Sequence, residues 1–197
     1  MNIKIVVPTV LVLIIVGVVG IYMFSNMGTQ AEDSEPSKTF IIIGYYWGFA
    51  LYDENYNPID RIELKVGEPV KIIFLNARSF SEEFYSKLEM KTVEEGLDSV
   101  PPSILEDKIM EAFESNLVDH GLQVTGLRLA IATNWRAFSG TADTLEEFFE
   151  IESEEAIQRH TAIITPDKPG VYDLLCYVVC GFGHTFMKLD NAIIVTE

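Results

Sequence analysis

The sequence is poor in basic residues, and this shortage excludes two broad classes of partner. Lysine and arginine together number 14, against 30 aspartates and glutamates, and the net charge is −16 over 197 residues. Nucleic acids and anionic membrane surfaces attract basic proteins, so this charge argues against both as partners. The chain also lacks internal repeats and low-complexity tracts. Its length suits one ordinary domain with a buried core and an appendage.

Charge is absent altogether from residues 5–24, which read IVVPTVLVLIIVGVVGIYMF. As a helix, this run would be about 30 Å long and would match the core of a bilayer. A cleaved signal peptide is the alternative, but its apolar region is usually only ~7–15 residues long. Because Lys4 precedes the run and acidic residues follow it, we expect a single-pass cell-membrane anchor (1–27) with a cytoplasmic N-terminus. Residues 28–38 are then a linker, and 39–197 form an extracytoplasmic domain.

The pattern of the remaining chain predicts a mainly β domain. Short runs rich in β-branched and aromatic residues occupy 39–53, 60–66, 69–77, 120–133, 159–166, 170–176 and 191–197. Turn residues bound these runs, so we expect about seven antiparallel strands in a Greek-key sandwich or barrel.

Two acidic segments, at about 79–117 and 136–156, interrupt these runs and are predicted to be helical insertions. They are interpreted either as a solvated cover or as a docking face for a positively charged partner.

Cysteine is also scarce, and both cysteines fall within one segment of twelve residues, CYVVCGFGHTFM (176–187). Cys176 and Cys180 could form a disulfide outside the cytoplasm. His184 and Met187 in the same segment favour a metal instead, because thiolate, imidazole and thioether together select copper. A mononuclear blue-copper centre uses one cysteine, two histidines and a weak methionine, and two thiolates can alternatively bridge two copper ions.

A second histidine ligand has to come from elsewhere in the chain, which offers His120 and His160. His120 opens a predicted strand after a long excursion. His160 is expected to be solvated or at a strand edge. We therefore predict that His120 is the ligand.

The segment 176–187 contains the pattern C-x-x-x-C-G-x-x-H-x-x-M and resembles subunit II of haem-copper terminal oxidases (the cytochrome c oxidase subunit II family). Two further stretches are similar to that family, namely Asp119-His120-Gly121 and the first predicted strands at 44–74. The chain has one predicted membrane span, whereas two are commoner in the family, and in this respect it is similar to the B-type oxidases.

The resemblance implies a cupredoxin-like domain that holds the binuclear copper centre CuA. The thiolates of Cys176 and Cys180 would bridge the two coppers. His120 and His184 would each supply one imidazole to one copper. Met187 and the backbone carbonyl of Val178 would be the axial ligands. Most members carry glutamate at the position of Val178, where its carboxylate binds magnesium, so a magnesium site is in doubt here. Trp47 lies at the place where the family receives electrons, although aromatic strand residues are also common core residues.

The implied function is electron entry into a respiratory chain complex. The domain would accept electrons from cytochrome c or a small copper protein and pass them to haem in subunit I, which reduces dioxygen beside other membrane subunits. The alternatives are a membrane-anchored mononuclear cupredoxin that only shuttles electrons, and a copper-binding or copper-delivery protein. Nitrous-oxide reductase has a similar copper domain, but it is attached to a large propeller that this chain lacks.

Overall fold

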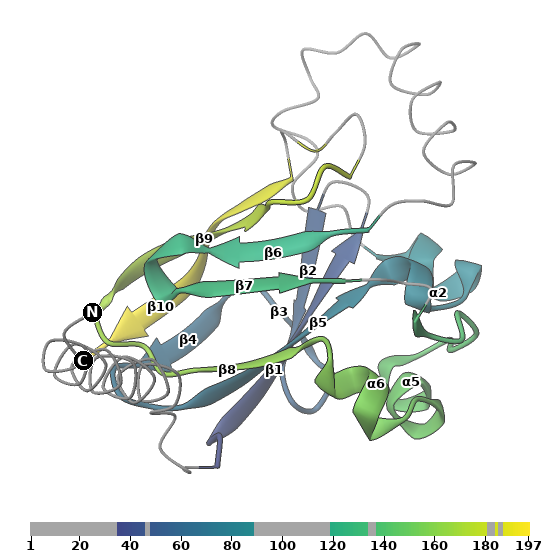
Figure 1. The fold of residues 1–197 in the computed structure, drawn as a ribbon, viewed down its shortest axis with the longest axis horizontal. Helices are drawn as coiled ribbons and strands as arrows, with labels where there is room; N and C mark the ends of the chain where they lie inside the picture. Colours follow the sequence, from purple (N-terminus) through teal and green to yellow (C-terminus); the bar gives the residue numbers. More distant parts are fainter. Residues whose placement is uncertain (1–34, 46–47, 89–118, 134–136, 181–183, 185–186) are drawn as a thin grey trace, which may run out of the picture. The chain divides into compact units, whose positions relative to one another are not determined.

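A computed structural model describes residues 35–45, 48–88, 119–133, 137–180, 184 and 187–197 (Figure 1). The predicted membrane anchor, most of the linker and Trp47 lie outside these residues. Within the described ranges no helix is both long and apolar enough to cross a membrane. The compact unit of Pro36–Glu197 is the domain described below.

Two five-stranded sheets form the domain, which confirms the mainly β prediction. Sheet A has the order β3-β2-β1-β5-β8, and sheet B has the order β4-β10-β9-β6-β7. The strands of sheet A are β1 (Lys38–Tyr45), β2 (Gly48–Tyr52), β3 (Pro58–Ile59), β5 (Val70–Asn76) and β8 (Thr161–Ile164). The strands of sheet B are β4 (Ile62–Lys65), β6 (Gly121–Val124), β7 (Leu129–Ala132), β9 (Gly170–Cys176) and β10 (Lys188–Thr196).

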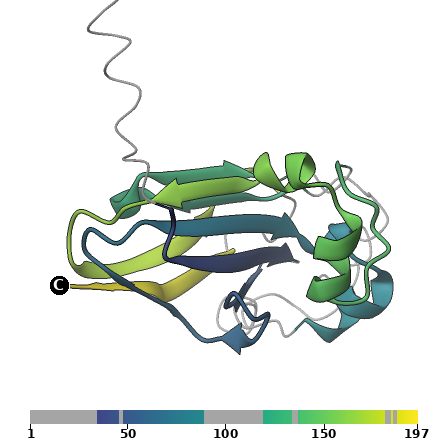
Figure 2. The same ribbon diagram turned by 90° about the horizontal axis from the view of Figure 1, so that it is seen from below.

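The core lies between the two sheets, which form two layers in Figure 2. Strands β4 and β7 alternate between buried and exposed residues, as expected for strands with one face on a core. Strands β1 and β5 are buried along almost their whole length. Their run of apolar residues, including the fully buried Ile42, Ile72 and Phe74, therefore anchors the centre of sheet A.

The strand count and strand directions differ from the prediction. Two of the predicted runs are divided in the structure: 39–53 contains β1 and β2, and 120–133 contains β6 and β7. The described residues contain ten strands in all. The expectation of purely antiparallel pairing is wrong, because β1 pairs with β5 and β4 pairs with β10 in parallel. The chain crosses from β3 in sheet A to β4 in sheet B and returns to β5, so β5 re-enters sheet A alongside β1 in the same direction.

Three short helices gather at one end of the sheets (Figure 1), and they belong to the two acidic segments. They are α2 (Glu82–Lys87), α5 (Leu145–Ile151) and α6 (Glu154–Gln158). Thr144 and Ser153 cap α5 and α6 by accepting hydrogen bonds from the backbone amides of Glu147 and Ala156. Residues 89–117 of the first predicted helical insertion lie outside the described residues.

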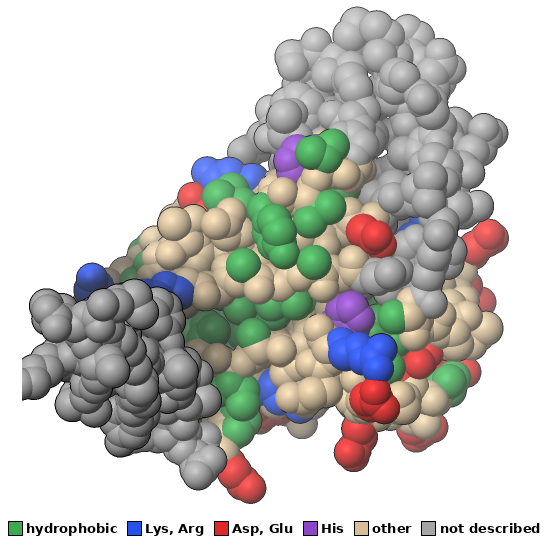
Figure 3. Space-filling model, viewed as in Figure 1, with side chains coloured by type: hydrophobic (Ala, Val, Ile, Leu, Met, Phe, Trp, Pro, Cys, Tyr) green, Lys and Arg blue, Asp and Glu red, His purple; other side chains and the backbone are tan. Residues whose placement is uncertain are grey.

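The two acidic segments pack on each other through apolar side chains. Phe148 of α5 is fully buried, and its ring lies 4.7 Å from that of Phe80 and 5.1 Å from that of Phe138. A β-bridge joins Phe80 to Ala142. The second segment is therefore not only a solvated cover, since one side of α5 contributes to the core while its glutamates face outward (Figure 3).

Candidate metal centre

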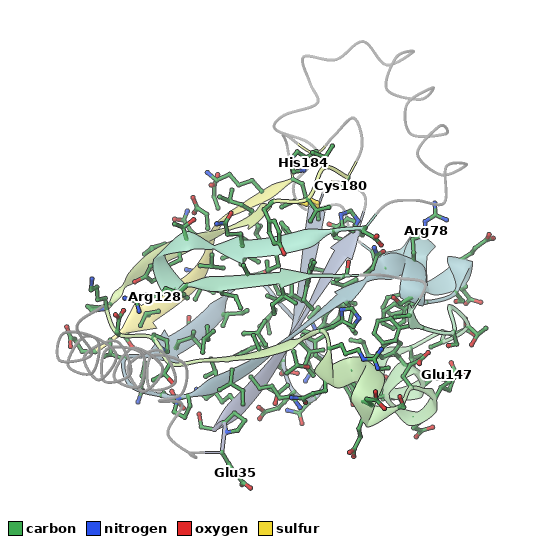
Figure 4. All side chains as sticks on the ribbon, in the orientation of Figure 1. Glu35, Arg78, Arg128, Glu147, Cys180 and His184 are labelled. Atoms are coloured by element: carbon green, nitrogen blue, oxygen red, sulfur yellow. The ribbon has the colours of Figure 1, made fainter. Side chains whose placement is uncertain are left out.

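The segment between β9 and β10 carries four of the predicted ligands, and we call residues 176–187 the metal loop. Cys176 is the last residue of β9, and Met187 immediately precedes β10. The backbone amide of Cys176 donates a hydrogen bond of 3.0 Å to the carbonyl of Met187, so the β9–β10 hairpin brings the two ends of the loop together. Figure 4 shows Cys180 and His184 side by side at this end of the hairpin, well apart from Glu147 on α5.

The sulfur and nitrogen atoms of the metal loop converge on Cys180. Its Sγ lies 3.6 Å from Cys176 Sγ, 3.6 Å from His184 Nδ1 and 3.7 Å from Met187 Sδ. Both cysteines are free thiols, so the disulfide alternative is not formed in this structure. Cys180 and Met187 are each only 2% exposed, whereas His184 is half-buried. The loop thus collects two thiols, an imidazole and a thioether in a largely dry pocket of side chains.

His120 joins this cluster from a distant part of the sequence. It immediately precedes β6, is 2% exposed, and has a ring nitrogen within 4.8 Å of both cysteine sulfurs. Its Nδ1 is buried and has no hydrogen-bond partner among the described residues. Because a buried polar atom without a partner is costly, this nitrogen is suited to a ligand that the protein itself does not supply.

His160 lies immediately before β8 at the edge of sheet A, which is one of its two predicted places, but it is buried. It is 6% exposed, so the expectation of a solvated histidine is wrong. Its backbone amide bonds to Ile157 O at the end of α6, which turns the side chain inward between the sheets. There Nδ1 lies 3.2 Å from the carbonyl of Ala132, and the ring packs on Phe138. The cluster of possible ligands in the described residues contains His120 and omits His160.

Val178, whose backbone carbonyl is a predicted axial ligand, lies beside the thiol of Cys176. Its backbone oxygen is 3.2 Å from Cys176 Sγ. Its side chain packs over Gly121, where an added Cβ would lie only 2.6 Å from Val178 Cγ2. The neighbouring Tyr177 and Val179 point outward, at 44% and 82% exposure, so the metal loop presents an apolar surface to its surroundings.

The pKa values of the two thiols are shifted in opposite directions. The hydrogen bond with Cys180 holds the pKa of Cys176 well below its usual range, and contacts with His120 and the Gly121 amide act in the same direction. The same hydrogen bond, together with burial, raises the pKa of Cys180. Since the thiolate is the form that binds metals, the pair holds one ligand that is already ionised.

Sequence reasoning missed the residues that hold His120 in place. Thr133, just after β7, bonds to both backbone groups of His120, and Gly44 on β1 leaves room for its ring. A Cβ added at Gly44 would lie 3.1 Å from His120 Cβ. Neither residue belongs to the predicted ligand set, and no pattern in the sequence indicates that either one contacts His120.

The arrangement defines a class of site, a buried cluster of one histidine and two cysteines that could hold a metal ion, on a two-sheet β domain. No protein-family model and no curated protein matches the chain. The solved structures similar to it include the periplasmic domain of subunit II of cytochrome oxidase (CoxB) of Bradyrhizobium japonicum. The two are 12% identical, the match covers 83% of this chain and 87% of that one, and the TM-score is 0.44.

Two further solved structures are similar to the chain. One is a heme-copper terminal oxidase dimer, with 15% identity, coverage of 99% and 100%, and a TM-score of 0.41. The other is a mixed disulfide intermediate between the thioredoxin-like protein TlpAs and subunit II of cytochrome c oxidase, with 11% identity, coverage of 85% and 87%, and a TM-score of 0.43. These are structures of the family that the motif resembles.

Proposed function

We propose that this domain holds the binuclear copper centre CuA and is the electron-entry subunit, subunit II, of a haem-copper terminal oxidase. The observation that carries the proposal is the meeting of His120 with the metal loop. The buried imidazole of His120, whose Nδ1 has no hydrogen-bond partner among the described residues, has a ring nitrogen within 4.8 Å of two free sulfurs that are 3.6 Å apart. Two thiols, two imidazoles and a thioether are the donor set that copper favours over harder metals.

The spacing of the two sulfurs suits a bridged pair of ions. Metal–thiolate bonds are about 2.3 Å long, so one ion fits on either side of a sulfur pair separated by 3.6 Å. His120 and His184 would each bind one copper, while Met187 and the carbonyl of Val178 would be the weak axial ligands. Bound copper would supply one-electron transfer.

The chain's own residues keep such a centre dry and rigid. Burial of Cys180, Met187 and His120 excludes water from the ligand atoms. The hairpin bond between Cys176 and Met187 fixes the ends of the metal loop, so the donor atoms change position little when charge changes. His184 is more exposed than the other ligands, which places it toward the molecule's surroundings.

The partners follow from this role. Electrons would come from cytochrome c or a small copper protein and pass to haem in subunit I, where dioxygen is reduced. Residues 5–24 would anchor the chain beside subunit I and other membrane subunits, with the domain outside the cytoplasm. Val178 offers no carboxylate, so the contact that the family's glutamate makes with an interface magnesium would be missing at this position.

One observation favours a second candidate, a mononuclear cupredoxin. The short contacts to His184 and Met187 both involve Cys180, so Cys180 with these two residues and His120 would already complete a blue-copper set. Cys176 would then have no role in binding metal.

Metal counting and electron paramagnetic resonance on the copper-loaded chain separate these candidates. We expect two coppers per chain and hyperfine splitting from two equivalent copper nuclei, because both thiolates touch both ions. Cys176→Ser should reduce the count to one copper of the blue type, and His160→Ala should leave two. One copper in the unmodified chain would establish the mononuclear candidate. If the unmodified chain bound no copper, the cysteines would have a structural role instead.

A further inference from the structure

We propose that Thr133 is a positioning residue that fixes the orientation of the copper ligand His120. The inference rests on the proposed copper centre and assigns a role to a residue outside the predicted ligand set. It starts from the way in which strands β6 and β7 end. These strands pair antiparallel, and their last paired residues are Gly121 and Ala132. His120 and Thr133 are the next pair along.

The pairing of His120 and Thr133 departs from an ordinary ladder. The amide of Thr133 donates to the carbonyl of His120 at 2.8 Å, as in a hydrogen-bonded antiparallel pair. In such a pair the amide of His120 would donate in return to the carbonyl of Thr133. It donates instead to the side-chain hydroxyl of Thr133, at 3.2 Å. The hydroxyl thus replaces a backbone acceptor at the point where the ladder ends.

The same hydroxyl also contacts the carbonyl of His120, as a donor at 3.2 Å. One side chain therefore satisfies the backbone donor of the ligand residue and adds a second hydrogen bond to its carbonyl, which already accepts from the Thr133 amide. Thr133 is only 3% exposed and His120 only 2%, so water is a poor substitute. Among residues of this shape only threonine can do this, because valine has the same branched form without the hydroxyl.

The opposite side of this segment faces the metal loop. The amide of Gly121 lies 3.5 Å from Cys176 Sγ, and the amide of Tyr177 donates to Gly121 O. Gly44 limits movement of the His120 ring from a third side. The backbone of His120 is thus held between Thr133 and the loop that carries both thiols. Any rotation released by loss of the hydroxyl would act on the imidazole and hence on one copper alone.

A positioning role of Thr133 would affect the two coppers unequally, and this distinguishes it from a role in overall stability. Because His120 and His184 would each bind one ion, the unpaired electron is shared equally only while the two ligand sets match. Turning His120 changes one set, so the two hyperfine couplings should separate. A merely structural residue would lower stability and leave the couplings equal.

The test compares Thr133→Val, Thr133→Ser and Thr161→Val in the full chain. Thr161 is the matched control, because its hydroxyl also donates to a backbone carbonyl, that of Ile157, at 2.9 Å on β8. In the copper-loaded chain, Thr133→Val should give unequal hyperfine couplings and a shifted reduction potential. Thr133→Ser keeps the hydroxyl and should behave as the unmodified chain, as should Thr161→Val.

A second measurement needs no copper. In the metal-free chain, hydrogen exchange at the His120 amide should become about tenfold faster in Thr133→Val, because a buried amide loses its acceptor. Should Val disturb packing, Thr133→Ala repeats both measurements with a smaller side chain. Unchanged exchange and equal couplings in either hydroxyl-free variant would overturn the proposal, as would the same changes in Thr161→Val. An unmodified chain without a copper pair would contradict the proposed function, while the exchange measurement still decides the role of Thr133.

Discussion

At the scale of single residues, Gly121 sets how closely the metal loop approaches β6. A Cβ at this position would lie 2.6 Å from Val178 Cγ2 and 2.8 Å from Tyr177 Cε1, well inside van der Waals contact. The Tyr177 ring is partly exposed and can turn away, but the β-branched Val178 has little freedom at χ1. The absence of a side chain at residue 121 is therefore a requirement of the loop, and the loop holds two thiols and a carbonyl.

We predict that Gly121→Ala weakens copper binding and lowers the free energy of unfolding by about 1–3 kcal/mol, the usual cost of overpacking. Gly67→Ala is the control, because its φ of +79° is strained for alanine but no atom lies within 4 Å of the added Cβ. A competition titration with a copper chelator and denaturant unfolding measure the two effects. Adding Val178→Ala to Gly121→Ala should restore copper affinity. Equal copper affinities for Gly121→Ala and Gly67→Ala would refute the argument.

Some residues of the candidate site could be predicted from the sequence, and others could not. Cys176, Cys180, His184 and Met187 could be predicted because their ligand atoms recur within twelve consecutive residues. His120 was identified by its place before a strand. The buried position of His160 was not predictable, since it depends on the turn at the end of α6. Thr133 acts only through a partner 13 positions away.

At the scale of elements, the helices at one end of the sheets are joined by a cluster of aromatic rings. Phe148 on α5 is at its centre, in contact with the rings of Phe80, Phe138 and Phe149. Tyr56, from the turn between β2 and β3, stacks on Phe149. The helices are short, and isolated helices of this length are unstable in water, so this packing rather than helix propensity holds them in place.

We predict that Phe148→Ala lowers the free energy of unfolding by about 3–5 kcal/mol, the usual cost of removing a buried aromatic ring. Ile151→Ala, on the same helix, should cost much less because Ile151 is 49% exposed. Copper binding should persist in both variants under conditions in which they are folded, since α5 contributes no ligand. Denaturant unfolding and metal counting check these outcomes. A small effect of Phe148→Ala would mean that α5 is not part of the cooperative core.

Sequence patterns predicted most strands but not their partners. Alternation and β-branched residues identify a strand because they report burial of its faces. They carry no information on direction, so the parallel pairs β1–β5 and β4–β10 were missed. Two-residue β3 was missed because it is too short to show any period. The inward side of the acidic helix α5 was obscured by the number of glutamates around Phe148.

At the scale of the whole molecule, negative charge is distributed unevenly. Acidic side chains gather around the helices in Figure 3, whereas the face over β6 and β9 is largely uncharged. Charges on a surface of this kind steer an oppositely charged partner over distances beyond direct contact. The acidic helices would then influence how fast a basic donor arrives rather than how it transfers its electron.

We predict that electron transfer from a basic donor slows as salt rises, because exposed charges are screened beyond about 8 Å at physiological ionic strength. Stopped-flow reduction of the copper-loaded chain measures the rate. Neutralising three exposed glutamates of the helical end should lower both the rate and its salt dependence; these are Glu146, Glu150 and Glu154. An equal charge change among exposed residues of other segments, at Glu63, Asp167 and Glu197, is the control. Equal effects of the two triple variants would assign the acidic helices to solvation alone.

The parallel pairing of β4 with β10 also constrains the order in which the protein can be completed. Among the described strands, β4 (Ile62–Lys65) pairs only with Ile193–Thr196 of β10, so a strand made early in synthesis waits for a partner made much later. The metal loop lies immediately before β10, and its ends are joined only when β9 and β10 pair. Contacts between such distant segments form slowly because a long loop has to close first. The end of sheet B that carries the metal loop is thus assembled only after β10 has been made, and copper insertion would follow the pairing of β9 with β10.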